Sequence, residues 1–315
     1  MDLSLFFAGT GGSVPTARRG LPALLVRRGG ERLLFDCGEG TQRQLLRSTG
    51  LADLDDVFLT HFHADHWLGL PGMLKTFDLR DRRRPLTVHG PRGLRGLMDL
   101  VARAAGRTRY EVFVDELEPG QVVERDGYEI APFAVDHREG AVGYEISEPE
   151  RPGRFDAEAA ARLGVQPGPA FGRLASGHPV GDVRPEQVVG PARPGRLIVL
   201  SGDTAPCEAV EEAARGADVL VHEATFAHEE AERAHETRHS TATQAAALAK
   251  RAGVGMLALV HVSTRHTGRE IREEARETFP GTVVPRDFDT IEIPFPDHGP
   301  PRLVRWEHER PRAPA

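Results

Sequence analysis

Three histidines and one aspartate lie within six residues of the chain, in the stretch His61-Phe62-His63-Ala64-Asp65-His66. Neutral imidazole and carboxylate groups are ligands that zinc accepts, and so dense a set suits a site for two metal ions. A polar loop that happens to be rich in histidine is the alternative. It is disfavoured because candidate ligands recur elsewhere in the chain. The motif therefore predicts metal-assisted chemistry.

Each of four candidate ligands directly follows a short apolar run, which predicts a buried strand. These ligands are His61, His137, Asp203 and His261. Four strand ends that each deliver a histidine or an aspartate can meet at one edge of a stack of sheets. We therefore expect these side chains to converge on a rigid scaffold, where catalytic groups belong.

The elements that must position these ligands alternate between apolar strands and helical segments along most of the chain, which predicts an α/β fold. The alternation fails in residues 149–194, where proline and glycine crowd together and only 156–163 reads as a short helix. Such a stretch cannot supply strands to a central sheet. We expect one domain over residues 1–295 that contains 149–194 as an inserted flexible arm, followed by a flexible tail over 296–315.

Composition narrows the class of protein further. The chain has 315 residues, a net charge of −7 and two cysteines. The acidic balance argues against a basic coat for nucleic acid but allows a local basic patch. Two cysteines cannot form a disulfide framework. No apolar run is long enough for a membrane helix, and the N-terminus lacks the features of a secretory signal. We expect a cytoplasmic protein with no membrane association.

At these residues the chain resembles the metallo-β-lactamase superfamily and, within it, the ribonuclease Z family of tRNA 3′-processing endonucleases. The superfamily resemblance rests on the motif at 61–66, followed in order by His137, Asp203 and His261. The nuclease resemblance rests on further motifs across residues 1–295. These are Phe35-Asp36-Cys37-Gly38-Glu39-Gly40-Thr41-Gln42, His222-Glu223-Ala224-Thr225-Phe226, His239-Ser240-Thr241 and Gly164-Val165-Gln166-Pro167-Gly168-Pro169. The implied fold is an αββα sandwich, in which two mixed β-sheets lie between helices.

The resemblance implies a role for each ligand and two zinc ions per chain. The first zinc would be held by His61, His63 and His137, and the second by Asp65, His66 and His261. Asp203 would bridge the two ions. An anionic bridge screens the repulsion between two cations about 3.5–4 Å apart. Asp65 would also align the attacking hydroxide on phosphorus.

The same resemblance implies that Glu223 and His239 supply the proton that the leaving 3′ oxygen needs. A carboxylate beside an imidazole raises the pKa of the imidazole and fixes its tautomer. The alternative is that His239 simply precedes a helix, because Thr241 and Gln244 fit a capping box. Both interpretations can hold at once.

The implied function is a zinc-dependent endoribonuclease that removes the 3′ trailer of precursor tRNA and leaves a 3′-hydroxyl. One alternative is a small-molecule metallo-hydrolase of the same superfamily, of phosphodiesterase or arylsulfatase type. A second is a metal- or RNA-binding protein without catalysis. The arm favours the nuclease, because a small substrate needs no such protrusion, whereas a structured RNA is positioned by contacts far from the cleavage site.

We expect the arm to be an exosite for the tRNA body that works across a homodimer, as in the family. Its six arginines and five acidic residues leave it almost neutral. The arm returns just before the strand that carries Asp203, so we expect its base to lie beside the metals. The candidate substrate-binding residues are Arg19, Gly168, Pro169 and Arg173. The loop Pro15–Gly20 lacks the lysine and asparagine of bacterial relatives, which leaves open how substrates bearing CCA are treated.

Overall fold

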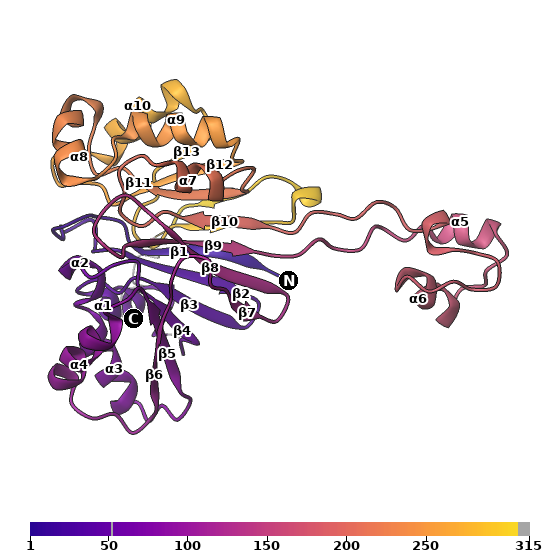
Figure 1. The fold of residues 1–315 in the computed structure, drawn as a ribbon, viewed down its shortest axis with the longest axis horizontal. Helices are drawn as coiled ribbons and strands as arrows, with labels where there is room; N and C mark the ends of the chain where they lie inside the picture. The colour runs from indigo at the N-terminus through magenta and orange to yellow at the C-terminus, as the bar shows by residue number, and fades with distance from the viewer. Residues whose placement is uncertain (52, 308–315) are drawn as a thin grey trace, which may run out of the picture.

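The first β-sheet of the computed structural model, which describes residues 1–51 and 53–307, contains both ends of the main domain (Figure 1). Its strands are β1 (Leu3–Gly9), β2 (Ala23–Arg28), β3 (Glu31–Phe35), β4 (Asp56–Phe58), β5 (Leu86–Gly90), β6 (Val112–Glu116), β14 (Thr290–Glu292) and β15 (Arg302–Val304). They lie in the order β15-β14-β1-β2-β3-β4-β5-β6. The four consecutive strands from β3 through β6 pair in parallel, and the remaining neighbours in the sheet are antiparallel.

The second sheet comes mainly from the later half of the chain. Its strands are β7 (Val123–Arg125), β8 (Tyr128–Ala134), β9 (Val142–Ser147), β10 (Leu197–Leu200), β11 (Val219–Glu223), β12 (Met256–Val260) and β13 (Thr282–Val283). They lie in the order β13-β12-β11-β10-β9-β8-β7. Strands β10 to β13 are parallel, and β7 to β10 are antiparallel.

Helices cover the outer face of each sheet, so the molecule has four layers (Figure 1). The first sheet carries α1 (Thr41–Arg47), α2 (Ala64–Trp67), α3 (Leu70–Leu79) and α4 (Leu94–Ala105). The second carries α7 (Glu208–Ala213), α8 (Ala231–Thr237), α9 (Ala242–Ala252), α10 (Gly268–Thr278) and the short turn η2 (His228–Glu230). The predicted αββα sandwich is confirmed.

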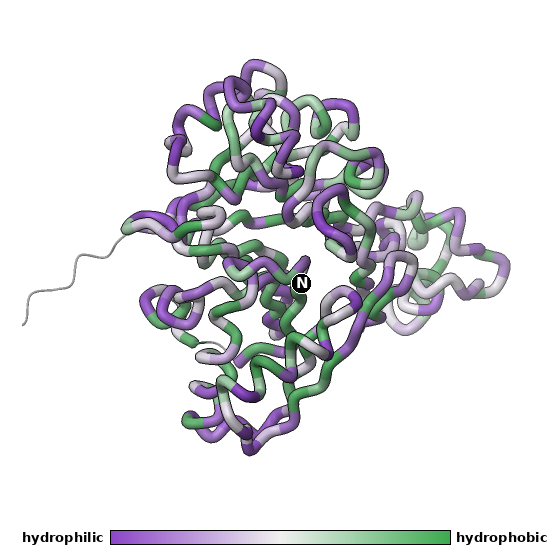
Figure 2. Tube along the Cα trace, turned by 60° about the vertical axis from the view of Figure 1, so that its left-hand side comes forward, coloured by the Kyte–Doolittle hydropathy of each residue, from purple (hydrophilic) through white to green (hydrophobic). Residues whose placement is uncertain are grey.

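Strand β1 shows how the sequence produces these layers. Its side chains alternate: Leu5 and Phe7 enter the core between the two sheets, whereas Phe6 and Ala8 pack under the helices of the first sheet. The two-residue period of a strand delivers apolar groups to both faces. Figure 2 shows hydrophobic residues concentrated along the central strands and hydrophilic ones along the outer loops and helices. None of the helices in the described ranges is long and apolar enough to cross a membrane.

The sandwich is locked next to the metal-ligand edge by an aromatic cluster between the sheets. The rings of Phe35 and Phe58 stack at 4.8 Å, and the ring of Tyr144 meets both edge-on. The Tyr144 hydroxyl donates to the carbonyl of Leu59 at 2.7 Å. Since the next two residues are Thr60 and His61, this contact fixes the strand end from which the first ligand projects.

Some elements differ from those predicted. The chain continues past residue 295 into the turn η3 (Pro296–His298) and then β15, which pairs antiparallel with β14. The predicted boundary at 295 is therefore too early, and the part of the predicted tail at 308–315 lies outside the described residues. Strands β6 and β7 and helix α8 were not predicted. The side chains of β6 and β7 are mostly half-buried, so the apolar alternation that marks a buried strand is weak there.

The inserted arm leaves the domain after β9 and returns at β10, as predicted (Figure 1). Two isolated bridges, between Arg151 and Arg193 and between Phe155 and Val189, hold its two limbs together. Its tip contains two helices, α5 (Ala157–Arg162) and α6 (Pro169–Ala175), and the turn η1 (Pro185–Gln187). Only the first helix was predicted. Helix α6 begins with proline, which is tolerated in the first turn because the amide there has no helical partner.

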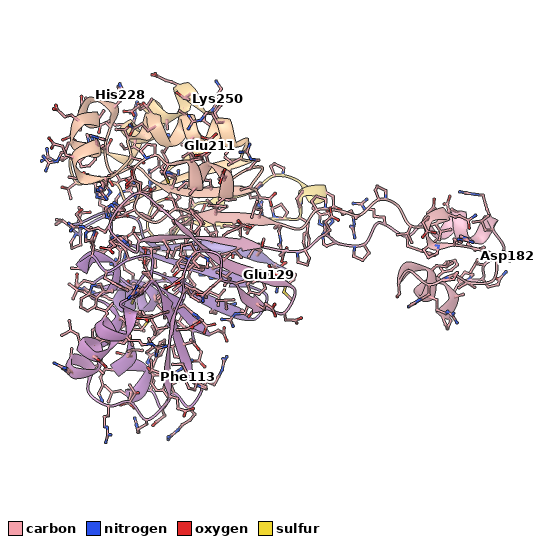
Figure 3. All side chains as sticks on the ribbon, viewed as in Figure 1. Phe113, Glu129, Asp182, Glu211, His228 and Lys250 are labelled. Carbon is pink, nitrogen blue, oxygen red and sulfur yellow. The ribbon has the colours of Figure 1, made fainter. Side chains whose placement is uncertain are left out.

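The arm points away from the metal-ligand edge, and the prediction that its base lies beside the metals is wrong. Strand β10 runs from Leu197, which pairs with Ser147 at the arm, to Leu200, which pairs with Tyr144. Asp203 follows the far end of this strand. Figure 3 shows Asp182 at the arm tip and His228 at the opposite side of the molecule. A strand that separates the arm from Asp203 in sequence also separates them in space.

Candidate metal centre

The structure brings the seven predicted ligands together at one edge of the two sheets. Their nitrogen and carboxylate oxygen atoms form two groups, and the atoms of each group lie within 4.8 Å of one another. The first group is His61, His63, His137 and Asp203, and the second is Asp65, His66 and His261. Residues that are up to 200 positions apart in the chain meet here because each follows the end of a strand or begins a helix.

One carboxylate oxygen links the two groups. Asp203 Oδ2 lies 3.3 Å from His66 Nε2, 3.3 Å from His261 Nε2 and 3.8 Å from His61 Nε2. Burial alone would raise the pKa of Asp203, but the imidazoles of His261 and His66 outweigh burial and hold it well below the ordinary value. Asp203 is therefore an anion placed between two sets of nitrogen ligands.

Hydrogen bonds on the first-sheet side set which nitrogen of each imidazole faces the centre. His66 Nδ1 donates to Asp36 Oδ2 at 2.8 Å. His61 Nδ1 lies 3.0 Å from Thr60 Oγ1, and this hydroxyl is also within 3.1 Å of the Asp36 carboxylate. Because a carboxylate can only accept, Thr60 donates to Asp36 and accepts from His61. Both imidazoles therefore carry their proton on Nδ1 and turn Nε2 inward.

The second sheet supplies two equivalent supports. His137 Nδ1 donates to the carbonyl of Arg238 at 2.8 Å. His261 Nδ1 lies 2.8 Å from Thr225 Oγ1, and Thr225 donates in turn to a carboxylate oxygen of Glu223 at 2.6 Å. These contacts again leave Nε2 free to face the centre. Such outer hydrogen bonds orient histidines that bind metal ions and raise their basicity.

The imidazole nitrogens that face the centre are better explained as ligands of a pair of cations than as hydrogen-bond partners of one another. His63 Nδ1 lies 2.9 Å from His61 Nε2 and 3.1 Å from His137 Nε2. Within the part of the chain that the structure describes, His66 Nε2 is buried without a hydrogen-bond partner. Burial lowers the pKa of His61, with the neighbouring His66 adding to the effect, which keeps the His61 ring neutral as a ligand must be. The donor set of imidazole nitrogens and carboxylate oxygens suits zinc.

Strained backbone surrounds the centre. Four of the six non-glycine residues with positive φ in the described chain belong to it: Ser13, Asp36, Arg238 and His261. Such a backbone conformation is energetically unfavourable for a residue other than glycine, and it persists only where the surrounding structure fixes it. Each performs a task here. The amide of Ser13 donates to Asp65 Oδ2 at 2.8 Å, and the other three supply the contacts described above.

The glycine turn at residues 9–12 is required by His261. A Cβ on Gly12 would lie 2.4 Å from His261 Nδ1, so any side chain there would displace the imidazole. The turn thus allows two segments to approach closely, directly against a predicted ligand.

An ion pair between a histidine and a glutamate adjoins the ligands. His239 Nδ1 donates to Glu223 Oε1 at 2.6 Å. The amides of Thr204 and Thr225 also donate to Glu223, whose side chain is fully buried. Burial would lower the pKa of His239, but the carboxylate of Glu223 outweighs burial and raises the pKa to about 9. His239 therefore keeps a proton at neutral pH and, with Nδ1 engaged, can give it up only from Nε2.

His239 is close enough to the centre to act on a group held there. One of its ring nitrogens lies within 4.8 Å of candidate ligand atoms of Asp203 and His261. The predicted capping box also forms, since Thr241 accepts from the amide of Gln244 and starts helix α9. His239 therefore combines the two predicted positions, before a helix and beside the ligands.

The four predicted substrate-binding residues are not gathered at this centre. Arg19 donates inward to Thr10 Oγ1 at 2.6 Å and to the carbonyl of Pro285 at 3.1 Å, which uses its guanidinium to fix the loop that contains it. Gly168, Pro169 and Arg173 lie at the far tip of the arm (Figure 1).

The supporting groups Ser13, Thr60 and Arg238 were missed from the sequence. Ser13 and Arg238 act through their backbone, which carries no residue-type signal. Asp36 and Thr225, by contrast, lie within the motifs at 35–42 and 222–226 that carry the nuclease resemblance, and those motifs could have identified them.

The fold and the two ligand groups define a metal-dependent hydrolase of the metallo-β-lactamase type. The sequence model described as "Metallo-beta-lactamase superfamily" matches residues 19–174. Ribonuclease Z of Methanosarcina acetivorans is 47% identical over 302 residues, covering 93% of this chain and 99% of that protein. Ribonuclease Z of Natronomonas pharaonis is 49% identical over 308 residues, covering 94% and 100%. The chain belongs to the ribonuclease Z family of this superfamily.

Solved structures agree with this assignment. The short form of human tRNase Z superposes with a TM-score of 0.68 at 26% identity, covering 93% of this chain and 100% of that one. The Bacillus subtilis protein YhfI, a metallo-β-lactamase fold protein, superposes with a TM-score of 0.69 at 19% identity, which shows the shared fold alone.

Proposed function

We propose that this chain is a zinc-dependent endoribonuclease that removes the 3′ trailer from precursor tRNA and leaves a 3′-hydroxyl on the tRNA, acting in the cytoplasm. The observation that carries this proposal is the His239–Glu223 ion pair beside the Asp203 bridge. An RNA diester has a poor leaving group, a ribose 3′ oxygen, and a protonated imidazole at this position supplies what that group needs. Relatives named ribonuclease Z at nearly full coverage support the same substrate class.

In the proposed assignment His61, His63 and His137 would hold one zinc ion, Asp65, His66 and His261 would hold the other, and Asp203 would contribute its carboxylate to both. Bound zinc would act as a Lewis acid on the scissile phosphodiester and lower the pKa of coordinated water.

The remaining steps belong to the side chains. Asp65, held by the amide of Ser13, would accept a hydrogen bond from the attacking water and align it. His239 Nε2 would donate its proton to the departing 3′ oxygen. Glu223 holds His239 in the required tautomer and, through Thr225, also orients the ligand His261. The proton donor and a metal ligand thus share one buried carboxylate.

The direction of the arm supports a homodimer. The arm leaves the edge of the molecule opposite its own metal centre, so it cannot hold an RNA whose scissile bond lies in that centre. We propose that the arm of each subunit holds the tRNA body that its partner cleaves.

Cleavage of a precursor tRNA with a 3′ trailer, followed by mapping of both product ends, tests the function. We expect a 3′-hydroxyl on the tRNA and a 5′-phosphate on the trailer, with activity removed by a chelator and restored by zinc. Hydrolysis of a nitrophenyl phosphodiester without cleavage of the RNA would instead identify a small-molecule hydrolase.

Mixing two inactive variants tests the homodimer. One variant lacks residues 151–193 and has an intact centre, and the other is His239→Ala with an intact arm. If arms work across the dimer, the equimolar mixture recovers activity at about a quarter of the wild-type sites, because half of the dimers are mixed and each has one complete site. No recovery after subunit exchange would contradict the arrangement.

A further inference from the structure

A large cavity next to the metal centre has no part in the ligand set. Its volume is about 1060 Å³, and its walls come from the loop 15–20, helices α1 and α10, and the segments 262–264 and 284–289. Arg305 and Trp306, just beyond β15, complete the walls. The cavity lies near the centre, since Val262 in its wall directly follows the ligand His261, and its loop begins two residues after Ser13, whose amide contacts Asp65.

The walls carry a strong excess of positive charge. Eight arginines line the cavity against three acidic residues, in a chain whose net charge is −7. Among the described residues, six of these arginines form no ion pair with a carboxylate, and one of the six, Arg19, is held by Thr10 and the carbonyl of Pro285. The other five are Arg18, Arg43, Arg47, Arg272 and Arg286. Arg272 Nε is in addition buried without a hydrogen-bond partner in this part of the chain. Charge gathered in this way attracts a polyanion.

Two of the three acidic residues of the wall, Asp287 and Asp289, are already engaged by other groups and form no ion pair with these five arginines. Asp287 accepts from Thr10 Oγ1 at 2.7 Å, from the amide of Gly20 at 2.6 Å and from Gln44 Nε2 at 2.6 Å. Asp289 accepts from Arg305 Nη1 at 2.5 Å and from the amide of Trp306 at 2.9 Å. These contacts fix the walls of the cavity and leave the five arginines for a ligand.

An aromatic ring at the cavity adds a second kind of contact. Trp306 leaves 39% of its surface exposed to solvent, although large hydrophobic residues of this chain are mostly buried. Its ring meets Phe288 edge-on at a centroid distance of 5.9 Å, which holds its orientation. An exposed aromatic ring beside unpaired arginines is the arrangement that single-stranded nucleic acid requires, with bases stacked on the ring and phosphates on the cations.

We propose that this basic cavity binds unpaired nucleotides of the RNA adjacent to the scissile phosphodiester, with a base on Trp306 and phosphates on Arg47, Arg272 and Arg286. The inference rests on the proposed ribonuclease function for the identity of the RNA. The nucleotides must be unpaired, because a base inside an A-form helix does not offer its face to a side chain. They come either from the trailer or from the unpaired 3′ end of the tRNA.

Tryptophan fluorescence tests binding without relying on cleavage. The probe is a five-nucleotide oligoribonucleotide titrated into the full chain, which contains two tryptophans. We expect the oligonucleotide to quench emission in the wild type and not in Trp306→Phe, which retains an aromatic contact with Phe288. Trp306→Ala should weaken binding by about 5- to 150-fold, the value of one stacked base. A wild-type affinity in Trp306→Ala, or no quenching at all, would overturn the proposal.

Salt dependence tests the arginines. The double variant Arg47→Ala/Arg286→Ala should reduce the slope of log affinity against log salt by about 1.4, since each lost phosphate contact on a single strand removes about 0.7. The matched control is Arg103→Ala, an exposed arginine of helix α4 outside the cavity, which should leave the slope unchanged. Equal slopes in the double variant and the control, or displacement of the oligonucleotide by equimolar pyrophosphate, would contradict RNA binding.

Precursor tRNAs with trailers of one and five nucleotides distinguish the two sources of unpaired RNA. A higher KM of Trp306→Ala only with the long trailer assigns the cavity to the trailer, and an equal rise with both assigns it to the tRNA 3′ end. No rise with either substrate overturns the inference while the proposed function stands. If wild-type protein cleaves neither substrate, the function fails, and the fluorescence titration still decides whether the cavity binds RNA.

Discussion

Strands β9 and β10 carry the metal centre at one end and the arm at the other, and the two ends are stabilised in opposite ways. At the centre, five of the seven predicted ligands are each held by a further hydrogen bond, and strained backbone is fixed around them. At the other end, the root of the arm is firm and its outer part is only lightly attached. Under the proposed function, the chain thus separates chemistry, which needs fixed geometry, from recognition of the RNA, which needs reach.

The attachment of the arm shows this gradation. At the root, buried Arg196 donates twice to Glu148, which also accepts from Arg28 at 2.8 Å. Further out, surface Asp297 accepts from three arginines of the arm. These are Arg151 at 2.5 Å, Arg154 at 3.0 Å and Arg193 at 3.1 Å.

The tip of the arm is a small folded unit. Its core contains Val165, Leu174 and Val188, which are buried among themselves and make no part of the cores of the main domain. Three of the arm's six arginines are held at Asp297, and the other three, Arg162, Arg173 and Arg184, are at the tip, where the proposed contacts to RNA phosphates would form. The arm therefore resembles a small module on a stalk, and its loss should spare the fold of the main domain.

The largest effect should come from removing the bridge of the centre. Asp203→Ala takes away the carboxylate that lies between the two ligand groups, so both zinc ions should be lost from the purified protein. We expect kcat/KM to fall by about 10³- to 10⁵-fold on RNA and on a nitrophenyl phosphodiester alike, because metal ions supply several kcal/mol of transition-state stabilisation.

Elemental analysis checks the metal content, with two zinc ions per chain expected in the wild type. The control is Asp182→Ala, an aspartate at the tip of the arm (Figure 3), which should keep both ions. One zinc ion in each of the wild-type and Asp203→Ala proteins would rule out the bridged pair.

The next largest effect should come from the proton donor. His239→Ala should reduce kcat on precursor tRNA by about 10²- to 10⁴-fold, the usual range for a positioned general acid. The nitrophenyl diester should lose less, since its leaving group needs little protonation. Zinc content separates this role from ligation: if His239→Ala loses a metal ion, the residue is a ligand and not the acid.

The pH profile sharpens the same prediction. The carboxylate of Glu223 raises the pKa of His239 to about 9, so the acid form persists up to that pH and activity falls as pH rises beyond it. Glu223→Gln removes the charge, which lowers the pKa of His239 and should move this alkaline fall to lower pH. An unchanged alkaline limb in Glu223→Gln would show that another group titrates there.

The contrast between the two ends also explains what could be predicted from the sequence. The ligand motifs consist of residue types with special chemistry, and each follows an apolar run, so their convergence and the αββα fold could be predicted locally. Support from the carbonyl of Arg238 or the amide of Ser13 could not, because any residue has these groups. The direction of the arm was mispredicted because nearness to Asp203 in sequence was taken as nearness in space, although β10 intervenes.

Deleting the arm should affect only the RNA substrate. Replacing residues 151–193 by a short glycine linker should lower kcat/KM on precursor tRNA by about 10²-fold or more through lost phosphate and shape contacts. Hydrolysis of the nitrophenyl diester and zinc content should not change, since the length of a surface loop alters stability only logarithmically. Equal losses on both substrates would show that the arm is part of the main fold.

The smallest effect should come from loosening the arm without removing it. Asp297→Asn keeps the size of the side chain but removes the charge that gathers Arg151, Arg154 and Arg193, so the arm should sample more orientations. Because surface ion pairs contribute little individually, we expect KM for precursor tRNA to rise only about 2- to 5-fold, with kcat and diester hydrolysis unchanged.

The hydrogen bond from Arg151, with those from the other two arginines, holds the pKa of Asp297 well below its ordinary value. The carboxylate therefore stays ionised above the ordinary pKa of an aspartate, and its contribution is lost only as pH falls through the lowered value. The ratio of the variant KM to the wild-type KM should accordingly be constant from pH 6 to pH 8. The tip variant Asp182→Asn is the control for the loss of one negative charge. A rise in KM as large as that caused by deleting the arm would mean that Asp297 fixes the arm rigidly, and the distinction between a fixed centre and a lightly attached arm would not hold.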